Sequence, residues 1–203
     1  MGIKTFTIGA FETNTYLITK GDRAVIVDPG LDFISILDEV KQYKVEAILI
    51  THGHVDHIDG CGYIEAPIYV GKEDLINFSD NSRSLYKMSG MKPSYSNKNL
   101  NLIAVSDNEE IKLESFTFKA IHTPGHTAGG VCYYVENAGV VFSGDTLFRA
   151  SIGRSDFKTS STSALISSVK DKLFLLPDET IVFPGHMSAT KIGFEKEANP
   201  FVR

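Results

Sequence analysis

Short apolar runs, separated by glycine and polar residues, dominate the first quarter of the chain. Residues 3–8, 14–19 and 24–27 are rich in β-branched and aromatic residues, which is typical of strands. Residues 20–23, Lys-Gly-Asp-Arg, have the composition of a hairpin turn between the last two of these runs. The run at 45–50 is nearly all apolar, which predicts a strand buried on both faces.

Two later patterns have helical spacing. The apolar positions of residues 31–44 recur every three or four residues: Phe33, Ile36, Leu37 and Val40. Residues 160–176 place three apolar residues on one helical face: Leu165, Val169 and Leu173. Further strands are predicted at 67–70, 102–105, 110–113, 116–121, 130–134, 140–143 and 180–183. This order predicts an α/β (α+β) fold with mixed sheets and helices outside them.

Length and composition favour one ordinary globular domain. The 203 residues are 42% hydrophobic and 22% charged, and no linker, repeat or low-complexity tract divides them. We therefore expect a single domain over 1–203. Residues 72–95 mix a short helical pattern with Ser, Asn and Gly, and we expect them to form a surface insertion near the active site.

Charge and hydropathy exclude several classes of partner. The formal net charge of −5 argues against nucleic-acid binding, which needs clustered Lys and Arg. No apolar run is long enough to cross a bilayer, and the first residues show no signal-peptide pattern, so a cytoplasmic protein is expected. Cys132 lies in a predicted strand and is expected to be a small buried hydrophobic residue, and Cys61 is expected to fill space near the site.

All six histidines fall in three short stretches. These are Thr-His-Gly-His-Val-Asp-His at 51–57, His-Thr-Pro-Gly-His at 122–126 and Pro-Gly-His at 184–186. Neutral imidazole and carboxylate are the ligands that hold zinc or iron with open coordination positions. The concentration of histidine in these stretches therefore predicts a metalloenzyme.

The candidate ligands all follow predicted strands, so they should converge on one edge of the sheets. His52 and His54 are two residues apart in a loop, so both can point to one side. Asp56 and His57 come where a helix starts and point elsewhere, so one segment can supply two neighbouring metals. Five histidines and two aspartates are predicted ligands: His52, His54, Asp56, His57, His126, Asp145 and His186.

The motifs together resemble the metallo-β-lactamase superfamily. They are Thr-His-x-His-x-Asp-His, Thr-Pro-Gly-His-Thr, Gly-Asp-Thr-Leu-Phe and the late Pro-Gly-His. Within the superfamily they are similar to glyoxalase II-like hydrolases (hydroxyacylglutathione hydrolases). The likeness extends from Asn-Thr-Tyr at 14–16 to Ala-Asn-Pro-Phe at 198–201. The chain resembles the short bacterial form, which lacks the C-terminal helical region that helps to bind glutathione.

This resemblance implies a fold, a ligand set and an activity. The fold would be a four-layer αβ/βα sandwich. One metal would be held by His52, His54 and His126, the other by Asp56, His57 and His186, with Asp145 bridging them. Zinc is the expected metal, with iron and manganese as alternatives. Asp56 and Asp145 would act in catalysis with a metal-bound hydroxide.

Residues around this set have two interpretations each. His122 is expected to support the site by hydrogen bonding, with a ligand role as the alternative. Asp28 is expected to be a turn carboxylate that satisfies backbone N–H groups, with orientation of a ligand as the alternative. Arg154 is expected to form a buried ion pair with Asp156 beneath the site, in preference to a substrate role. Three residues of the 72–95 segment are candidates for substrate contact or for exposed surface: Arg83, Tyr86 and Lys87.

Thioester hydrolysis is the predicted reaction, giving a 2-hydroxy acid and a thiol from a small-molecule substrate. The thiolate is a good leaving group, so no general acid is needed, and the sequence shows no Ser-His-Asp or Cys-His arrangement. The alternatives are a mononuclear-iron persulfide dioxygenase using His52 or His54, His126 and Asp145, a lactonase or other hydrolase of the same fold, and a non-catalytic metal-binding module. A monomer or small homo-oligomer is expected.

Overall fold

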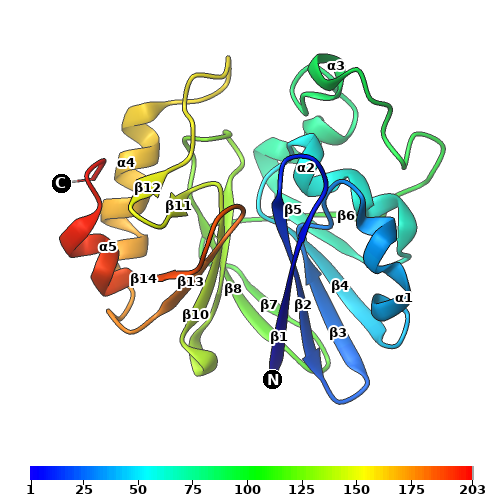
Figure 1. The fold of residues 1–203 in the computed structure, drawn as a ribbon, viewed down its shortest axis with the longest axis horizontal. Coiled ribbons are helices and arrows are strands. Elements are labelled where there is room, and N and C mark those ends of the chain that lie inside the picture. Colours follow the sequence, from blue (N-terminus) through cyan, green and yellow to red (C-terminus); the bar gives the residue numbers. More distant parts are fainter. Residues whose placement is uncertain (203) are drawn as a thin grey trace.

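The computed structural model describes residues 1–202, which form two six-stranded sheets packed face to face (Figure 1). The first sheet has the order β1 (Gly2–Ile8), β2 (Thr13–Lys20), β3 (Arg23–Val27), β4 (Lys44–Ile50), β5 (Ile68–Gly71) and β6 (Leu102–Val105). Strands β1 to β3 are antiparallel, and β3 to β6 are parallel. The hairpin predicted at 20–23 joins β2 to β3, where Lys20 lies opposite Arg23.

The second sheet is also mixed. Its order is β14 (Thr190–Lys191), β13 (Ile181–Pro184), β10 (Val140–Gly144), β9 (Val131–Val135), β8 (Thr117–His122) and β7 (Glu110–Lys112). A separate small pair is formed by β11 (Leu147–Phe148) and β12 (Ser151–Ile152). Strands β8, β10 and β13 run in one direction, because β9 is antiparallel to both β8 and β10 and β13 is parallel to β10.

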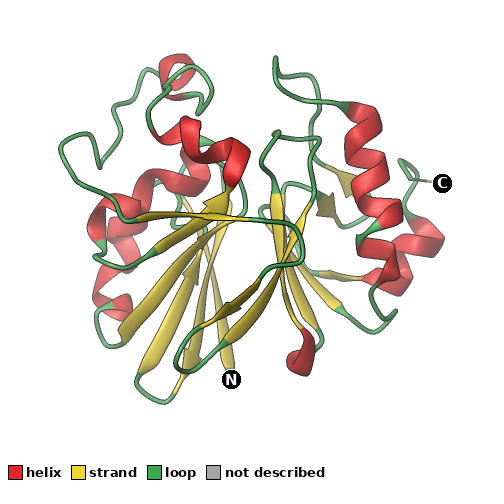
Figure 2. Ribbon diagram, turned by 180° about the vertical axis from the view of Figure 1, so that it is seen from behind, coloured by secondary structure: helices red, strands yellow, loops and turns green. Residues whose placement is uncertain are grey.

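Helices cover the outer face of each sheet (Figure 2). On the side of the first sheet lie α1 (Leu37–Val40), α2 (Val55–Ile58) and α3 (Tyr86–Ser89), and on the side of the second lie α4 (Thr162–Asp171) and α5 (Ile192–Ala198). Short 3-10 helices span Phe33–Ile36, Asp59–Tyr63, Lys72–Phe78, Glu136–Ala138 and Leu173–Leu175. None of the helices in residues 1–202 is long and apolar enough to cross a membrane.

Three hydrophobic layers hold these four layers of structure together. Along β3, Ala24 and Ile26 face the outer helices, while Val25 and Val27 face the second sheet. On the other side, Cys132 of β9 packs in the outer layer that contains Val169 of α4. Because both faces of the second sheet are covered at its centre, β9 and β10 are buried along their whole length, whereas the edge strands β1 and β7 keep exposed polar residues. The predicted αβ/βα sandwich is confirmed.

The predicted helices are shorter than their patterns suggested. Residues 31–44 form the 3-10 helix Phe33–Ile36 and the short α1, because Asp32 has a left-handed φ of 65° and β4 already begins at Lys44. The helix predicted at 160–176 is α4, which begins after Ser161, whose side chain accepts the N–H of Ala164. The pattern did not predict α5.

Candidate metal centre

The segment that follows β4 places four candidate ligands in six residues. His54 has an extended backbone, with φ −82° and ψ 152°, and α2 begins at the next residue. His52 and His54 therefore lie in the loop, whereas Asp56 and His57 lie on the first turn of α2. This change from loop to helix turns the two pairs of side chains in different directions, as the sequence predicted.

The remaining candidates come from the second sheet. His126 follows β8, Asp145 follows β10 and His186 follows β13. These three strands run in the same direction, so their carboxyl ends lie at one edge of the sheet. The structure thus brings all seven predicted ligands together from the strand ends of both sheets.

Two sets of three ligand atoms share no residue and form two separate groups, and a third set, His52, His57 and Asp145, overlaps both. His52, His54 and His126 each offer a ring nitrogen, and these nitrogens lie within 4.8 Å of one another. The closest pair is His126 Nε2 and His54 Nδ1, which are 2.9 Å apart. Asp56, His57 and His186 form the second group, in which Asp56 Oδ2 lies 3.4 Å from His57 Nε2 and 3.3 Å from His186 Nε2.

Asp145 lies between the two groups. Its Oδ2 is 3.5 Å from Nε2 of His126 in the first group and 3.6 Å from Nε2 of His186 in the second. Its Oδ1 is 3.5 Å from His57 Nε2. A single carboxylate therefore contacts ligands of both groups, as the bridging role implied by the resemblance requires.

Buried atoms without hydrogen-bond partners test whether this donor set suits metal ions. In residues 1–202, His52 Nε2, His57 Nε2 and Asp145 Oδ1 are buried and accept or donate no hydrogen bond. A buried polar atom left unpaired costs about 1–3 kcal/mol. Imidazole nitrogens and carboxylate oxygens are the donors that divalent transition metals prefer, so the residues fit metal ions.

The electrostatics of the two groups differ. Burial lowers the pKa of His52 and His54 well below the usual value, and the neighbouring histidines lower it further, so both rings are neutral as metal binding requires. Burial would also lower the pKa of His57, but Asp56, Asp28 and Asp145 outweigh it and raise that pKa well above the usual value. The carboxylates around His57 thus favour a positive charge at this position.

Asp28 satisfies a backbone N–H group, as its preferred interpretation expected, and also orients a candidate ligand, as the alternative expected. Oδ1 accepts the N–H of Thr51 at 2.7 Å, and Oδ2 accepts the Thr51 hydroxyl at 2.6 Å. Oδ2 also lies 2.9 Å from Nδ1 of His57, which leaves Nε2 of that ring free to face the other ligands. Both interpretations of this residue therefore agree with the structure.

Two other predicted supporting residues act differently from expectation. The ion pair of Arg154 with Asp156 is exposed and does not lie beneath the site. Instead, the main-chain carbonyl of Arg154 lies 2.8 Å from His126 Nδ1 and orients that ring. His122 contacts the carbonyl of Ala128 at 3.0 Å, in the loop that carries His126, so its support of the site is indirect.

A cavity of about 380 Å³ lies over the ligands. None of the three substrate candidates from the 72–95 segment lines it. Tyr86 is fully buried and donates to Asp59 Oδ1 at 2.7 Å, so its predicted contact with substrate is wrong. Arg83 pairs with Asp80 at 3.6 Å, and Lys87 is exposed away from the cavity.

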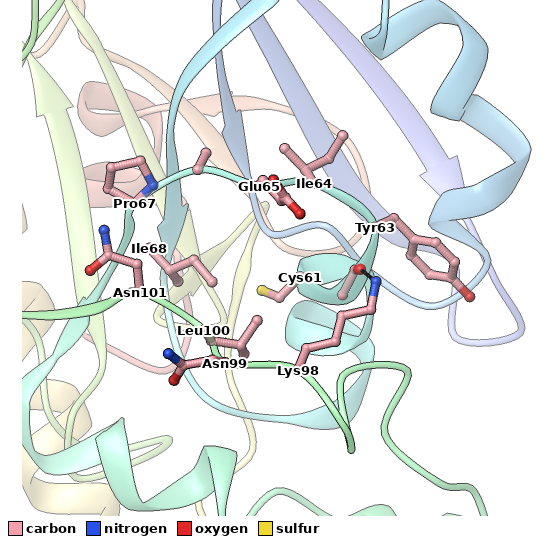
Figure 3. Close-up of a pocket in the computed structure, with 12 residues that line it drawn as sticks. Cys61, Tyr63, Ile64, Glu65, Pro67, Ile68, Lys98, Asn99, Leu100 and Asn101 are labelled. Atoms are coloured by element: carbon pink, nitrogen blue, oxygen red, sulfur yellow. Dashed lines mark hydrogen bonds between the residues drawn. The ribbon is translucent and has the colours of Figure 1, made fainter.

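A second cavity, of about 760 Å³, lies between residues 61–68 and 98–101 (Figure 3). Figure 3 shows the thiol of Cys61 beside Ile68 and Leu100, and Lys98 donating to the carbonyl of Gly62. Burial raises the pKa of this thiol well above its usual value, so it stays protonated and unreactive. In the described part of the chain, no group of metal ligands lies there.

Asp74 is a buried residue of the site that the sequence did not reveal. Its Oδ2 accepts the N–H of Gly53 at 2.8 Å, between the two histidines of the first loop. Its Oδ1 accepts the N–H of Gly129 at 2.9 Å, in the loop after His126. One carboxylate therefore ties together the two loops that carry the first group of ligands.

Replacing Asp74 with asparagine is expected to lower the free energy of unfolding by about 1–3 kcal/mol, because an amide NH₂ would face a backbone N–H that needs an acceptor. Metal affinity of the first group should fall with it. Denaturant unfolding and chelator competition measure the two effects. Asp80→Asn is the matched control, since exposed Asp80 also accepts two backbone N–H groups. Equal effects of the two substitutions would contradict the role given to Asp74.

Comparison with known proteins places this site in a family. The sequence profile of the Metallo-beta-lactamase superfamily matches residues 8–186. The chain is 30% identical to the hydroxyacylglutathione hydrolase GloC of Haemophilus influenzae, over 100% of this chain and 98% of that protein.

Two solved structures are similar over almost their whole length. BLEG-1 B3 metallo-beta-lactamase has a TM-score of 0.91 and 33% identity, covering 99% of both chains. TTHA1623 in a di-iron-bound form has a TM-score of 0.85 and 32% identity, covering 98% of this chain and 99% of that one.

Proposed function

Because this chain belongs to the metallo-β-lactamase superfamily, we propose that it is a two-metal hydrolase that cleaves a thioester into a 2-hydroxy acid and a thiol. The observation that carries the proposal is the pair of ligand groups joined by Asp145. The identity with GloC supports the hydroxyacyl thioester as the substrate type. The di-iron form of TTHA1623 supports two metals in a site of this shape.

We assign the ligands by their grouping. His52, His54 and His126 hold one metal, and the second is held by Asp56, His57 and His186, with Asp145 between them. Bound divalent metals would supply a Lewis acid for the carbonyl oxygen and a water of lowered pKa. Zinc fits the mixed nitrogen and oxygen donors, as do iron and manganese.

The side chains themselves position the ligands and shield them. Asp28 fixes the ring of His57, and the carbonyl of Arg154 fixes the ring of His126. Thr13 donates its hydroxyl to Asp56 Oδ2 at 3.1 Å and holds that carboxylate in place. The ring of Phe157 packs edge-on against His54, with ring centroids 5.0 Å apart, and covers that side of the ligand group.

The overall reaction needs no further protein acid. Water adds to the thioester carbon, the C–S bond breaks, and the sulfur leaves with its electron pair. The oxygen and one proton of water become part of the carboxylic acid, which ionises at neutral pH, and the second proton goes to the thiolate or to solvent. A thiolate is stable enough to leave without a proton from the protein. The aspartates and histidines that line the cavity would be bound to the metals and would not be needed as acids.

The decisive experiment is to purify the protein without added metal, quantify zinc, iron and manganese, and assay a panel of lactoyl thioesters with thiols of different charge. Two equivalents of metal and hydrolysis of at least one thioester are expected. Absence of hydrolysis of the whole panel under every metal loading would refute the proposal. A single iron with oxygen uptake on a persulfide would instead establish the dioxygenase alternative.

A further inference from the structure

We propose that the thioester bound by this site carries an apolar group beside its sulfur, and that a ring of apolar side chains around the cavity binds that group. This inference rests on the proposed hydrolysis and names the substrate class. We call the ring the apolar mouth, and it consists of Phe11, Leu85, Met88, Phe148, Phe157 and Met187.

Three members of the apolar mouth are unusually exposed. Phe11 is 52% exposed, Met88 74% and Met187 56%, and they come from the loop between β1 and β2, from α3 and from the loop after β13. Large apolar side chains scattered singly on a surface are ordinary, but a group that converges on one cavity marks a binding site. All three line the same cavity as the ligands His54, Asp145 and His186, so the exposed apolar surface adjoins the proposed reaction site.

The loops of the apolar mouth are held in place by the site itself. The carbonyl of Met187 accepts the side-chain amide of Asn14 at 2.8 Å. The carbonyl of Ser84, next to Leu85, accepts the N–H of Val55 at the start of α2. Leu85 and Met187 have left-handed φ values of 68° and 65°, which non-glycine residues adopt only when the surrounding structure imposes them. The backbone that carries Leu85 and Met187 is therefore held beside the cavity.

Among the residues that line the cavity, no unpaired Lys or Arg is available to bind an anionic thiol such as glutathione, whose peptide carries two carboxylates. Arg154 is the cation that lines the cavity, and its guanidinium already binds Asp156 at 2.9 and 3.0 Å. Arg83 and Lys87 do not reach the cavity. A volume of about 380 Å³ is near the low end of the roughly 300–1,000 Å³ of small-molecule pockets. This cavity suits a compact, uncharged group.

The four methionines of the chain allow a binding test that does not depend on turnover. Met88 and Met187 line the cavity, whereas Met1 and Met91 do not. The zinc-loaded protein, labelled with ¹³C at the methionine methyl groups, would be titrated with benzyl methyl sulfide and with S-methylglutathione. Both probes are unreactive methyl thioethers, and they differ in charge.

Benzyl methyl sulfide should shift the Met88 and Met187 signals while leaving Met1 and Met91 unchanged. The concentration of benzyl methyl sulfide at the midpoint of the titration should be at least ~10-fold lower than that of S-methylglutathione, because binding buries a phenyl ring. Equal shifts of all four signals, no shift, or tighter binding of S-methylglutathione would overturn the proposal.

Kinetics separate this inference from the proposed function. The lactoyl thioester of benzyl mercaptan should be hydrolysed with a kcat/KM at least ~10-fold above that of the lactoyl thioester of glutathione. Met88→Gln should reduce this preference several-fold, while Met91→Gln, at an exposed position outside the cavity, should leave it unchanged. Methionine shifts without any hydrolysis would refute the hydrolase proposal alone. Hydrolysis with a preference for the glutathione ester would refute the apolar mouth alone.

Discussion

Asp145→Asn is expected to lower kcat/KM for thioester hydrolysis on the order of 10³-fold, equivalent to about 4 kcal/mol. Asp145 lies 3.5 Å from His57 and from His126, one in each group, so its charge would act on both of the proposed metals at once. Asparagine keeps the size of the side chain but removes that charge and turns one acceptor into a donor facing imidazole nitrogens. Metal content should fall together with activity.

The folded state should survive this change. Oδ1 of Asp145 is buried without a hydrogen-bond partner in the described structure, so the metal-free protein loses no hydrogen bond at that atom. Denaturant unfolding of the metal-free proteins should therefore differ by less than about 1 kcal/mol. Asp171→Asn, at an exposed position of α4, is the matched control for loss of one charge. An Asp145→Asn protein that keeps two metals and most of its activity would contradict the bridging role.

The convergence of the candidate ligands could be predicted from the sequence because they follow predicted strands. Strands such as β4 and β10 are visible as apolar runs, and the residue after each run must lie at a sheet edge. The spacing of His52 and His54 then indicated a shared direction, which the extended backbone at His54 confirms. Local pattern was sufficient here because strand ends converge by the rules of sheet packing.

Residues that act across the sheets could not be predicted in this way. Asp28 reaches His57 because β3 and β4 pair in parallel, with Val27 opposite Leu49. The sequence of neither strand predicts this register. Asp74 lies in a segment without clear periodicity, so nothing indicated that its carboxylate is buried. The same segment hides the burial of Tyr86, whose ring packs in the outer core of the first sheet. Long-range contacts decide these roles.

Gly185→Ala is expected to lower kcat/KM by about 10²-fold or more, because small displacements of reacting groups cost that much. A Cβ at this position would lie 2.4 Å from Asp145 Oδ1 and 2.7 Å from Cε1 of His57. The backbone cannot withdraw easily, since the N–H of Gly185 donates to the carbonyl of Gly144 and its own carbonyl accepts the N–H of Asn14. The methyl group must therefore displace the carboxylate of Asp145 and the ring of His57.

Selective loss of one of the two metals would distinguish the expected effect of Gly185→Ala from a general loss of stability. Gly185→Ala should release the metal of Asp56, His57 and His186 at lower chelator concentration than the wild-type protein, with a smaller effect on the metal of the other group. Gly21→Ala adds the same methyl group where no atom lies within 4 Å, at a left-handed φ of 62°. That control should lose about 1 kcal/mol of stability and keep its metals and activity. If Gly185→Ala releases its metals at the same chelator concentration as the wild-type protein, the close approach of this glycine to Asp145 does not shape the site.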